Sequence, residues 1–129
     1  MEIFKTFSEL KTRKVGAVTI GNFDGFHLGH QSLIHALKKA TQNQPCLLIT
    51  FDPHPREVLN PSTQVPRLGR WEDLLEQFRT SGVDYVLRLQ FTEDLKNTSA
   101  HDFMAALWSA TPFSKLIIGH DFALGSHRE

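Results

Sequence analysis

Four short apolar runs punctuate the chain and are separated by longer segments of mixed polarity. Each run is rich in valine, isoleucine, leucine or phenylalanine, and each is continuous rather than alternating. Continuous apolar runs of this length are typical of strands that are buried on both faces of a sheet. The pattern therefore predicts four strands, at residues 15–20, 47–51, 85–89 and 115–118.

The segments between these runs have the periodicity of amphipathic helices. Apolar residues recur three and four positions apart in HQSLIHALKKA (30–40), RWEDLLEQFRTSG (70–82) and TSAHDFMAALW (98–108). Gly82 is a natural helix stop, and Thr98 or Ser99 is a natural helix start. Strands that alternate with helices predict an α/β domain, with an open parallel sheet and helices on both faces.

Composition narrows the classes of function. The 129 residues suit one domain, and 14 basic residues balance 14 acidic ones, which argues against a nucleic-acid or membrane-surface partner. The single cysteine, Cys46, lies in an apolar run, where we expect a buried and unreactive thiol. No run approaches the ~20 apolar residues of a membrane span, and MEIFKTFSEL does not resemble a signal peptide, so we expect a cytoplasmic location.

The most informative segment is GNFDGFHLGH, residues 21–30, which directly follows the first predicted strand. Ligands of open α/β sheets bind beyond the carboxyl ends of the strands. Glycines let the backbone approach a ligand closely, and the start of the next helix offers N–H groups to an anion such as phosphate. His27 and His30, three residues apart, could donate to phosphoryl oxygens and stabilise transition-state charge.

Other interpretations of this segment are weaker. A histidine pair could belong to a zinc site, but the further ligands are not obvious, and the glycines could serve only a tight turn. The spacing matches neither the dinucleotide fingerprint nor the P-loop.

Two later segments also follow predicted strands. TFDPHPREVL (50–59) follows the second, where Pro53 and Pro55 would hold an extended loop around His54, and Arg56 could contact phosphate or simply face solvent. IIGHDFALG (117–125) ends the fourth strand with another loop framed by glycines. Trp71 and Trp108 are expected to pack at the core or its flank, and His35, His101 and His127 to lie at the surface.

Taken together, these segments resemble a known family. GNFDGFHLGH resembles the H-x-G-H signature of the nucleotidyltransferases. With the two later segments and RLGRWEDLLEQFRTSGVDYVLRLQF (67–91), the chain is similar to the N-terminal FMN adenylyltransferase domain of bacterial bifunctional riboflavin kinase/FAD synthetases. The resemblance implies a Rossmann-like fold, with the first and fourth predicted strands side by side. It also implies transfer of AMP from ATP to FMN, assisted by Mg²⁺, to give FAD and pyrophosphate.

The resemblance also implies roles for individual residues. The catalytic residues would be His27 and His30. The residues that bind ATP would be Gly21, Asn22, Phe23, Asp24, Gly25, Gly29, Gly119, Asp121 and Phe122. The residues that bind FMN would be Thr50, Asp52, Pro53, His54, Pro55 and Arg56.

Two departures from the family pattern matter. Ala123 and Leu124 replace the usual arginine and phenylalanine of the fourth loop, which removes five N–H donors from the neighbourhood of a polyanionic ligand. The chain also ends at Glu129, before a further strand and an arginine-bearing motif of the family, and it lacks the riboflavin kinase domain. We therefore expect an incomplete adenylyltransferase domain that is inactive alone and has an unpaired sheet edge, which makes an oligomer plausible. The alternative function is a non-catalytic nucleotide- or flavin-binding module of the same descent.

Overall fold

A parallel five-stranded sheet forms the centre of the protein in the computed structural model, which describes residues 1–21, 23, 28–52 and 70–118. The strands are β1 (Glu2–Phe4), β2 (Ala17–Ile20), β3 (Cys46–Asp52), β4 (Tyr85–Gln90) and β5 (Lys115–Ile118). The helices are the 3-10 helix η1 (Phe7–Leu10) and the α-helices α1 (Leu28–Ala40), α3 (Trp71–Ser81), α4 (Glu93–Lys96) and α5 (Ala100–Ala110). The predicted α/β class is confirmed.

The order of the strands places a switch point between β2 and β5. The order across the sheet is β1-β4-β3-β2-β5, so the chain moves outward from β2 through β3 to β4 and then crosses back to the other side of β2. In the register between β2 and β5, Ile20 lies opposite Ile118, and both strands end there. This confirms that the first and fourth predicted strands are neighbours.

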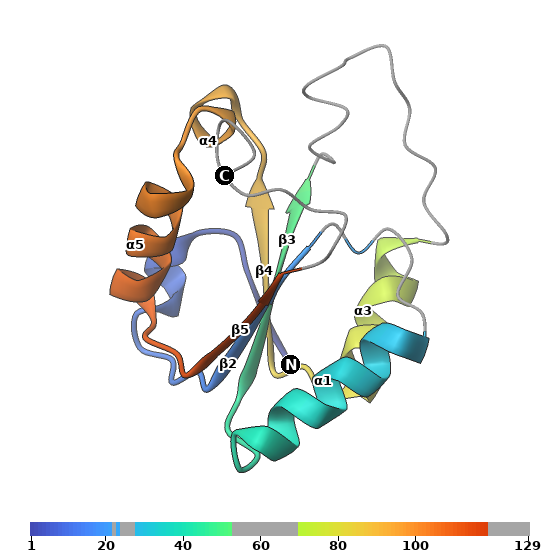
Figure 1. Ribbon diagram of the computed structural model, residues 1–129. Helices are drawn as coiled ribbons and strands as arrows, with labels where there is room; N and C mark the ends of the chain where they lie inside the picture. Colours follow the sequence, from blue (N-terminus) through green and yellow to red (C-terminus); the bar gives the residue numbers. More distant parts are fainter. Residues whose placement is uncertain (22, 24–27, 53–69, 119–129) are drawn as a thin grey trace.

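Helices cover both faces of the sheet, as Figure 1 shows, with α1 and α3 on one side and α5 and η1 on the other. The core under α1 and α3 contains Ala17, Phe23, Ile34, Leu37, Cys46, Leu48, Leu74, Phe78, Val83 and Val86. The core under α5 and η1 contains Phe4, Leu10, Val15, Val18, Ile20, Leu47, Ile49, Phe51, Leu87, Leu89, Phe103, Leu107 and Ala110. Because neighbouring residues of β3 and β4 alternate between the two cores, the continuous apolar runs follow from burial on both faces.

Local signals fix the ends of two helices as predicted. The Ser99 hydroxyl accepts a hydrogen bond from the Asp102 N–H at 3.0 Å, which caps the start of α5. Gly82 follows α3 with a φ of 99°, a left-handed conformation that glycine adopts without strain.

The sequence pattern missed some elements and placed several boundaries one or two residues away from those of the structure. The strand β1 and the helices η1 and α4 were not predicted, since each has only three or four residues and shows no period. The predicted strand at 15–20 begins at Ala17 in the structure, and just before it the N–H of Gly16 donates to the Pro45 carbonyl at 2.8 Å.

The isolated aromatic and imidazole side chains lie close to where they were expected. Trp71 is partly buried against the core under α3. Trp108 is 52% exposed and packs edge-on against Phe113, so it flanks the core. His35 and His101 are exposed, as predicted, whereas His127 lies outside the described residues.

Cys46 is fully buried, and we expect its thiol to be inert in the folded protein. Burial, reinforced by the nearby Asp84 carboxylate, raises the pKa of Cys46 to about 12, so almost no reactive thiolate exists at pH 8. A disulfide reagent such as Ellman's should react slowly with the native protein. In denaturant the same reagent should react rapidly and release one equivalent of its coloured thiolate. Equal rates in both conditions would contradict this assignment.

Candidate functional site

The candidate site lies where β2, β3 and β5 end. Parallel strands present their carboxyl ends at one edge of the sheet, and the switch point between β2 and β5 opens a crevice at that edge. Four of the predicted site residues are described there as whole residues: Gly21, Phe23, Thr50 and Asp52.

The first turn beyond β2 is tightly packed. The N–H of Gly21 donates to the Ile49 carbonyl at 3.1 Å, which ties the end of β2 to β3. A Cβ on Gly21 would lie 3.1 Å from the ring of Phe23, so a larger residue here would have to displace that ring. Phe23 has a φ of 50°, and its buried ring packs edge-on against Phe78 at 5.9 Å. Because this ring points into the core, any contact of Phe23 with a nucleotide would come from its backbone.

Helix α1 begins at this edge and runs back along the sheet (Figure 1). The first N–H groups of a helix lack partners within the helix and carry partial positive charge. Acidic residues occupy the first turns of α3, α4 and α5, but none lies in the first turn of α1. The start of α1 therefore keeps its attraction for an anion.

Most of the predicted site residues cannot be placed in this geometry. Gly29 and His30 lie in the first turn of α1, where the structure describes the helix but not their side chains. The following fall outside the described residues: Asn22, Asp24, Gly25, His27, Pro53, His54, Pro55, Arg56, Gly119, Asp121, Phe122, Ala123 and Leu124. Their roles stay predictions.

At the end of β3, one predicted site residue is buried and the other reaches solvent. Thr50 is buried in the sheet. The Asp52 side chain is 54% exposed, its carboxylate lies 3.4 Å from Nη2 of Arg88, and its backbone carbonyl accepts from the Phe91 N–H at 3.1 Å. Asp52 is therefore tied to β4 through both its backbone and its side chain.

Sequence reasoning did not single out Arg88. Its guanidinium lies over the Trp71 ring, with Cζ 3.9 Å from the ring centroid. The available signal was an arginine in the middle of the apolar strand YVLRLQ, two residues after the buried Val86.

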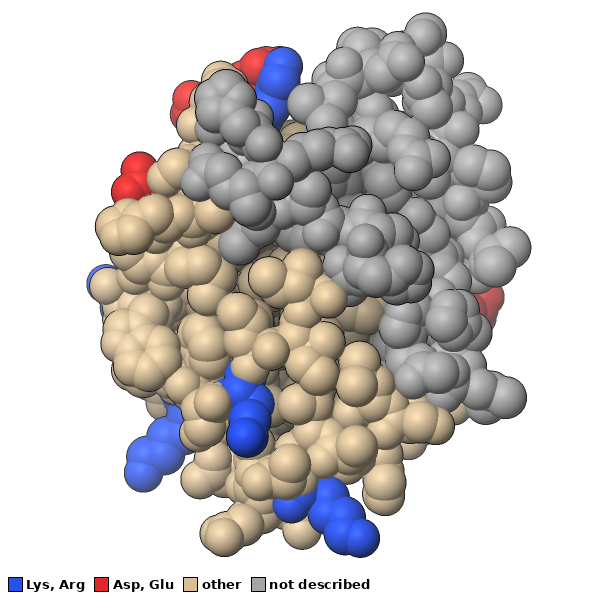
Figure 2. Space-filling view, in the orientation of Figure 1, with Lys and Arg blue, Asp and Glu red and all other residues tan. Residues whose placement is uncertain are grey.

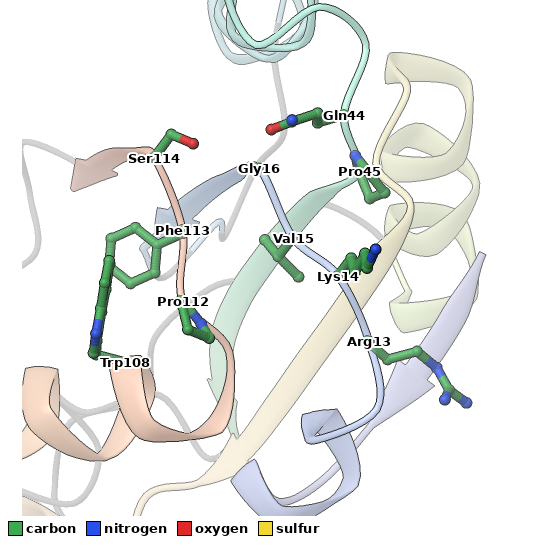
Figure 3. A pocket seen from close by; sticks show the side chains of 10 residues that line it. All are labelled: Arg13, Lys14, Val15, Gly16, Gln44, Pro45, Trp108, Pro112, Phe113 and Ser114. Atoms are coloured by element: carbon green, nitrogen blue, oxygen red, sulfur yellow. The ribbon is translucent and has the colours of Figure 1, made fainter.

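A cavity of about 530 Å³ opens at the opposite edge of the sheet, near the amino ends of β2, β3 and β5 (Figure 3). Trp108 and Phe113 line one side, while Val15, Gly16 and Pro45 lie toward the other. Because ligands of open parallel sheets bind at the carboxyl ends, this cavity is distinct from the candidate site.

Charge is dispersed on the face that Figure 2 shows: red and blue side chains adjoin at the top, and the other described charged side chains are spread among uncharged residues. Across residues 1–21, 23, 28–52 and 70–118, no three His, Cys, Asp or Glu side chains gather as a metal site. None of the described helices combines the length and the hydrophobicity that a membrane span requires.

Similarity to known proteins agrees with this geometry. Residues 9–129 match the family described as FAD synthetase. The bifunctional riboflavin kinase/FMN adenylyltransferase of Buchnera aphidicola subsp. Schizaphis graminum is 36% identical over 121 residues, covering 92% of this chain and 39% of the relative. Those of Escherichia coli K12 and Pseudomonas fluorescens are each 35% identical, covering 87% and 99% of this chain but 37% and 42% of their own lengths. This chain thus spans about two fifths of the length of these relatives.

A solved structure described as a macrolide-efflux protein from Streptococcus pneumoniae has the same fold. Its TM-score is 0.83 at 24% identity, over 98% of this chain and 43% of that one. This likeness supports the architecture, whereas the relation to the riboflavin kinase/FMN adenylyltransferases rests on the sequence. With the family match running from residue 9 to residue 129 and the switch point at β2 and β5 in place, the chain belongs to the FAD synthetase family.

Proposed function

We propose that this chain carries an FMN adenylyltransferase site, which transfers AMP from ATP to FMN and yields FAD and pyrophosphate. The observation that carries the proposal is the switch point between β2 and β5, at which GNFDGFHLGH leads into α1. A phosphate group at that point would meet the unneutralised positive end of a helix, in a family described as FAD synthetase.

The reaction is an in-line displacement at phosphorus. A phosphate oxygen of FMN forms a bond to the α-phosphorus of ATP, the bond from that phosphorus to the α–β bridging oxygen breaks, and pyrophosphate leaves with the electron pair. Such a reaction needs positioned reactants and stabilisation of charge on the phosphoryl oxygens. We assign the second task to His27 and His30, together with the first N–H groups of α1.

The two substrates would bind at different places beyond the carboxyl ends of the strands. ATP would lie over the turn after β2 and the end of β5, where the predicted ATP-binding residues are found in the sequence. FMN would lie toward the end of β3, where Thr50 and Asp52 precede Pro53, His54, Pro55 and Arg56. Mg²⁺ would enter with ATP, because phosphate oxygens are ligands that it prefers, and we assign it no protein ligand.

The test is to supply the protein, as the cell makes it, with ATP, Mg²⁺ and FMN and to measure FAD by chromatography. We expect FAD to appear only when both ATP and FMN are present. The change of the fourth loop to Ala123 and Leu124 favours a second candidate, a binding module without turnover. Tight binding of ATP and FMN with no FAD formed would support that module and overturn the proposal.

We also predict that residues 1–129 by themselves form FAD far more slowly than the Escherichia coli relative. We expect residues 1–129 to position ATP and FMN poorly, and such reactants lose much of the ~7–11 kcal/mol by which orientation can lower the reaction barrier. The same assay, run on this chain and on that relative side by side, measures the difference, and equal rates would show that 129 residues suffice. In the described part of the sheet, β5 pairs only with β2, so a strand from elsewhere could add there. A cytoplasmic location and self-association stay predictions.

A further inference from the structure

Arg88 occupies an unusual place for a charged residue. It lies on β4, an internal strand, opposite Thr50 of β3. Val86, two residues earlier, is buried in the core under α1 and α3, whereas Leu87 and Leu89 face the other core. Because side chains alternate along a strand, Arg88 leaves the sheet on the side of α1 and α3.

The contacts of Arg88 hold its guanidinium in one orientation but use its donors poorly. The group lies over the Trp71 ring at 3.9 Å, and its Nη2 is 3.4 Å from Oδ1 of Asp52. Its Nε is buried and has no hydrogen-bond partner among the residues that the structure describes. The side chain as a whole is 28% exposed.

These contacts make Arg88 a poor choice for the stability of the fold, compared with an apolar residue at the same position. A buried N–H without a partner lowers the stability of the folded state. An ion pair to a half-exposed carboxylate contributes little stability to offset that loss. An apolar side chain at position 88 would instead extend the row begun by Val86. Residues that break local rules in this way are expected where function requires them.

We propose that Arg88 is a positioning residue for FMN, which acts through Asp52 and is itself held by Trp71. The inference rests on the proposed function, which places FMN at the end of β3. The Phe91 N–H donates to the backbone carbonyl of Asp52, and the Arg88 guanidinium lies 3.4 Å from its carboxylate, so the residues on and just after β4 orient Asp52 at the end of β3.

The strand order makes this role selective. The proposed ATP site lies at β2 and β5, and β3 separates these strands from β4. Loss of Arg88 should therefore weaken the binding of FMN and leave the binding of ATP nearly unchanged.

The experiment is Arg88→Met in the protein as the cell makes it, with KM measured separately for each substrate. We expect the KM for FMN to rise about tenfold or more, since small displacements of positioned reactants cost this much, while the KM for ATP changes less than about twofold. Methionine fills the site without a charge, so the melting temperature should stay the same or rise. A purely structural arginine would give the opposite result, a lower melting temperature with no selectivity between substrates.

Three further variants sharpen the test. Arg79→Met removes an exposed arginine of α3 that pairs with Glu76, and it should change neither KM. Arg88→Lys keeps the charge but loses the planar fork that stacks on Trp71, so it should not restore FMN affinity. Asp52→Asn combined with Arg88→Met should be no worse than either change alone, because residues that act as a unit are not additive.

Several outcomes would overturn the inference: equal rises in both KM values, full activity in Arg88→Met, or additive effects of the Asp52 and Arg88 changes. A wild-type protein that forms no FAD would instead overturn the proposed function. In that case titration by FMN fluorescence decides the role of Arg88. Weaker FMN binding by Arg88→Met with unchanged ATP binding would support this role. Equal FMN binding by the variant and the wild type, or no FMN binding by the wild type, would refute it.

Discussion

Replacing His30 with alanine should reduce FAD formation at least ~10²-fold, which is the usual cost of removing one group that stabilises a transition state. His30 lies in the first turn of α1, directly after the loop that follows β2. On the proposed mechanism, an imidazole there would add a donor to a helix end that favours an anion. The loss should appear mainly in kcat, because the proposed interaction would form as charge develops on the α-phosphoryl oxygens.

The matched control is His35→Ala, which removes an exposed imidazole from the same helix. This variant should keep wild-type kcat, and both variants should keep the wild-type circular dichroism spectrum. Wild-type turnover by His30→Ala, or its global unfolding, would count against the role assigned to His30.

Replacing Phe78 with alanine should destabilise the protein by about 3–5 kcal/mol, the typical cost of deleting a buried aromatic ring. Phe78 lies on α3, and its side chain is fully buried. Its ring contacts two others edge-on, with the centroid of Phe23 at 5.9 Å and that of Trp71 at 6.4 Å. The cavity would open between the turn after β2 and the start of α3, so we expect weaker ATP binding as well. Urea unfolding measures the free-energy loss.

Trp108→Ala provides the comparison, since it deletes a larger ring that is 52% exposed. Its cost should stay within about 1 kcal/mol, as for most surface substitutions. Similar losses for Phe78→Ala and Trp108→Ala would mean that the ring cluster around Phe78 is not a main support of the fold.

The fold was predictable because its longest elements carry strong periodic signals. The buried strands β2 and β3 read as continuous apolar runs, and α3 carries an apolar stripe that ends at Gly82. By contrast, β1 is three residues long and only Phe4 is buried, so nothing in EIF distinguishes a strand from a loop. Its place depends on pairing with β4, a contact between residues more than 80 positions apart along the chain.

The candidate site was predictable only in part. Motifs at the ends of strands indicated one edge of the sheet, and the structure brings the ends of β2, β3 and β5 to that edge, because parallel strands end together. The stacking of Arg88 on Trp71 was not predictable, since it depends on how α3 packs across β4. The inward orientation of the Phe23 ring was not predictable either, because it depends on a backbone φ of 50° and on the edge-on contact with Phe78.

The activity proposed for this protein is transfer of the adenylyl group of ATP to FMN, and following the α-phosphorus tests it. The protein, as the cell makes it, is incubated with FMN, Mg²⁺ and ATP labelled at the α-phosphorus, and the products are separated by chromatography. We predict that the label moves into FAD in step with the release of unlabelled pyrophosphate. Label that remains in ATP while FMN and ATP are both bound would contradict adenylyl transfer and leave a binding module in its place.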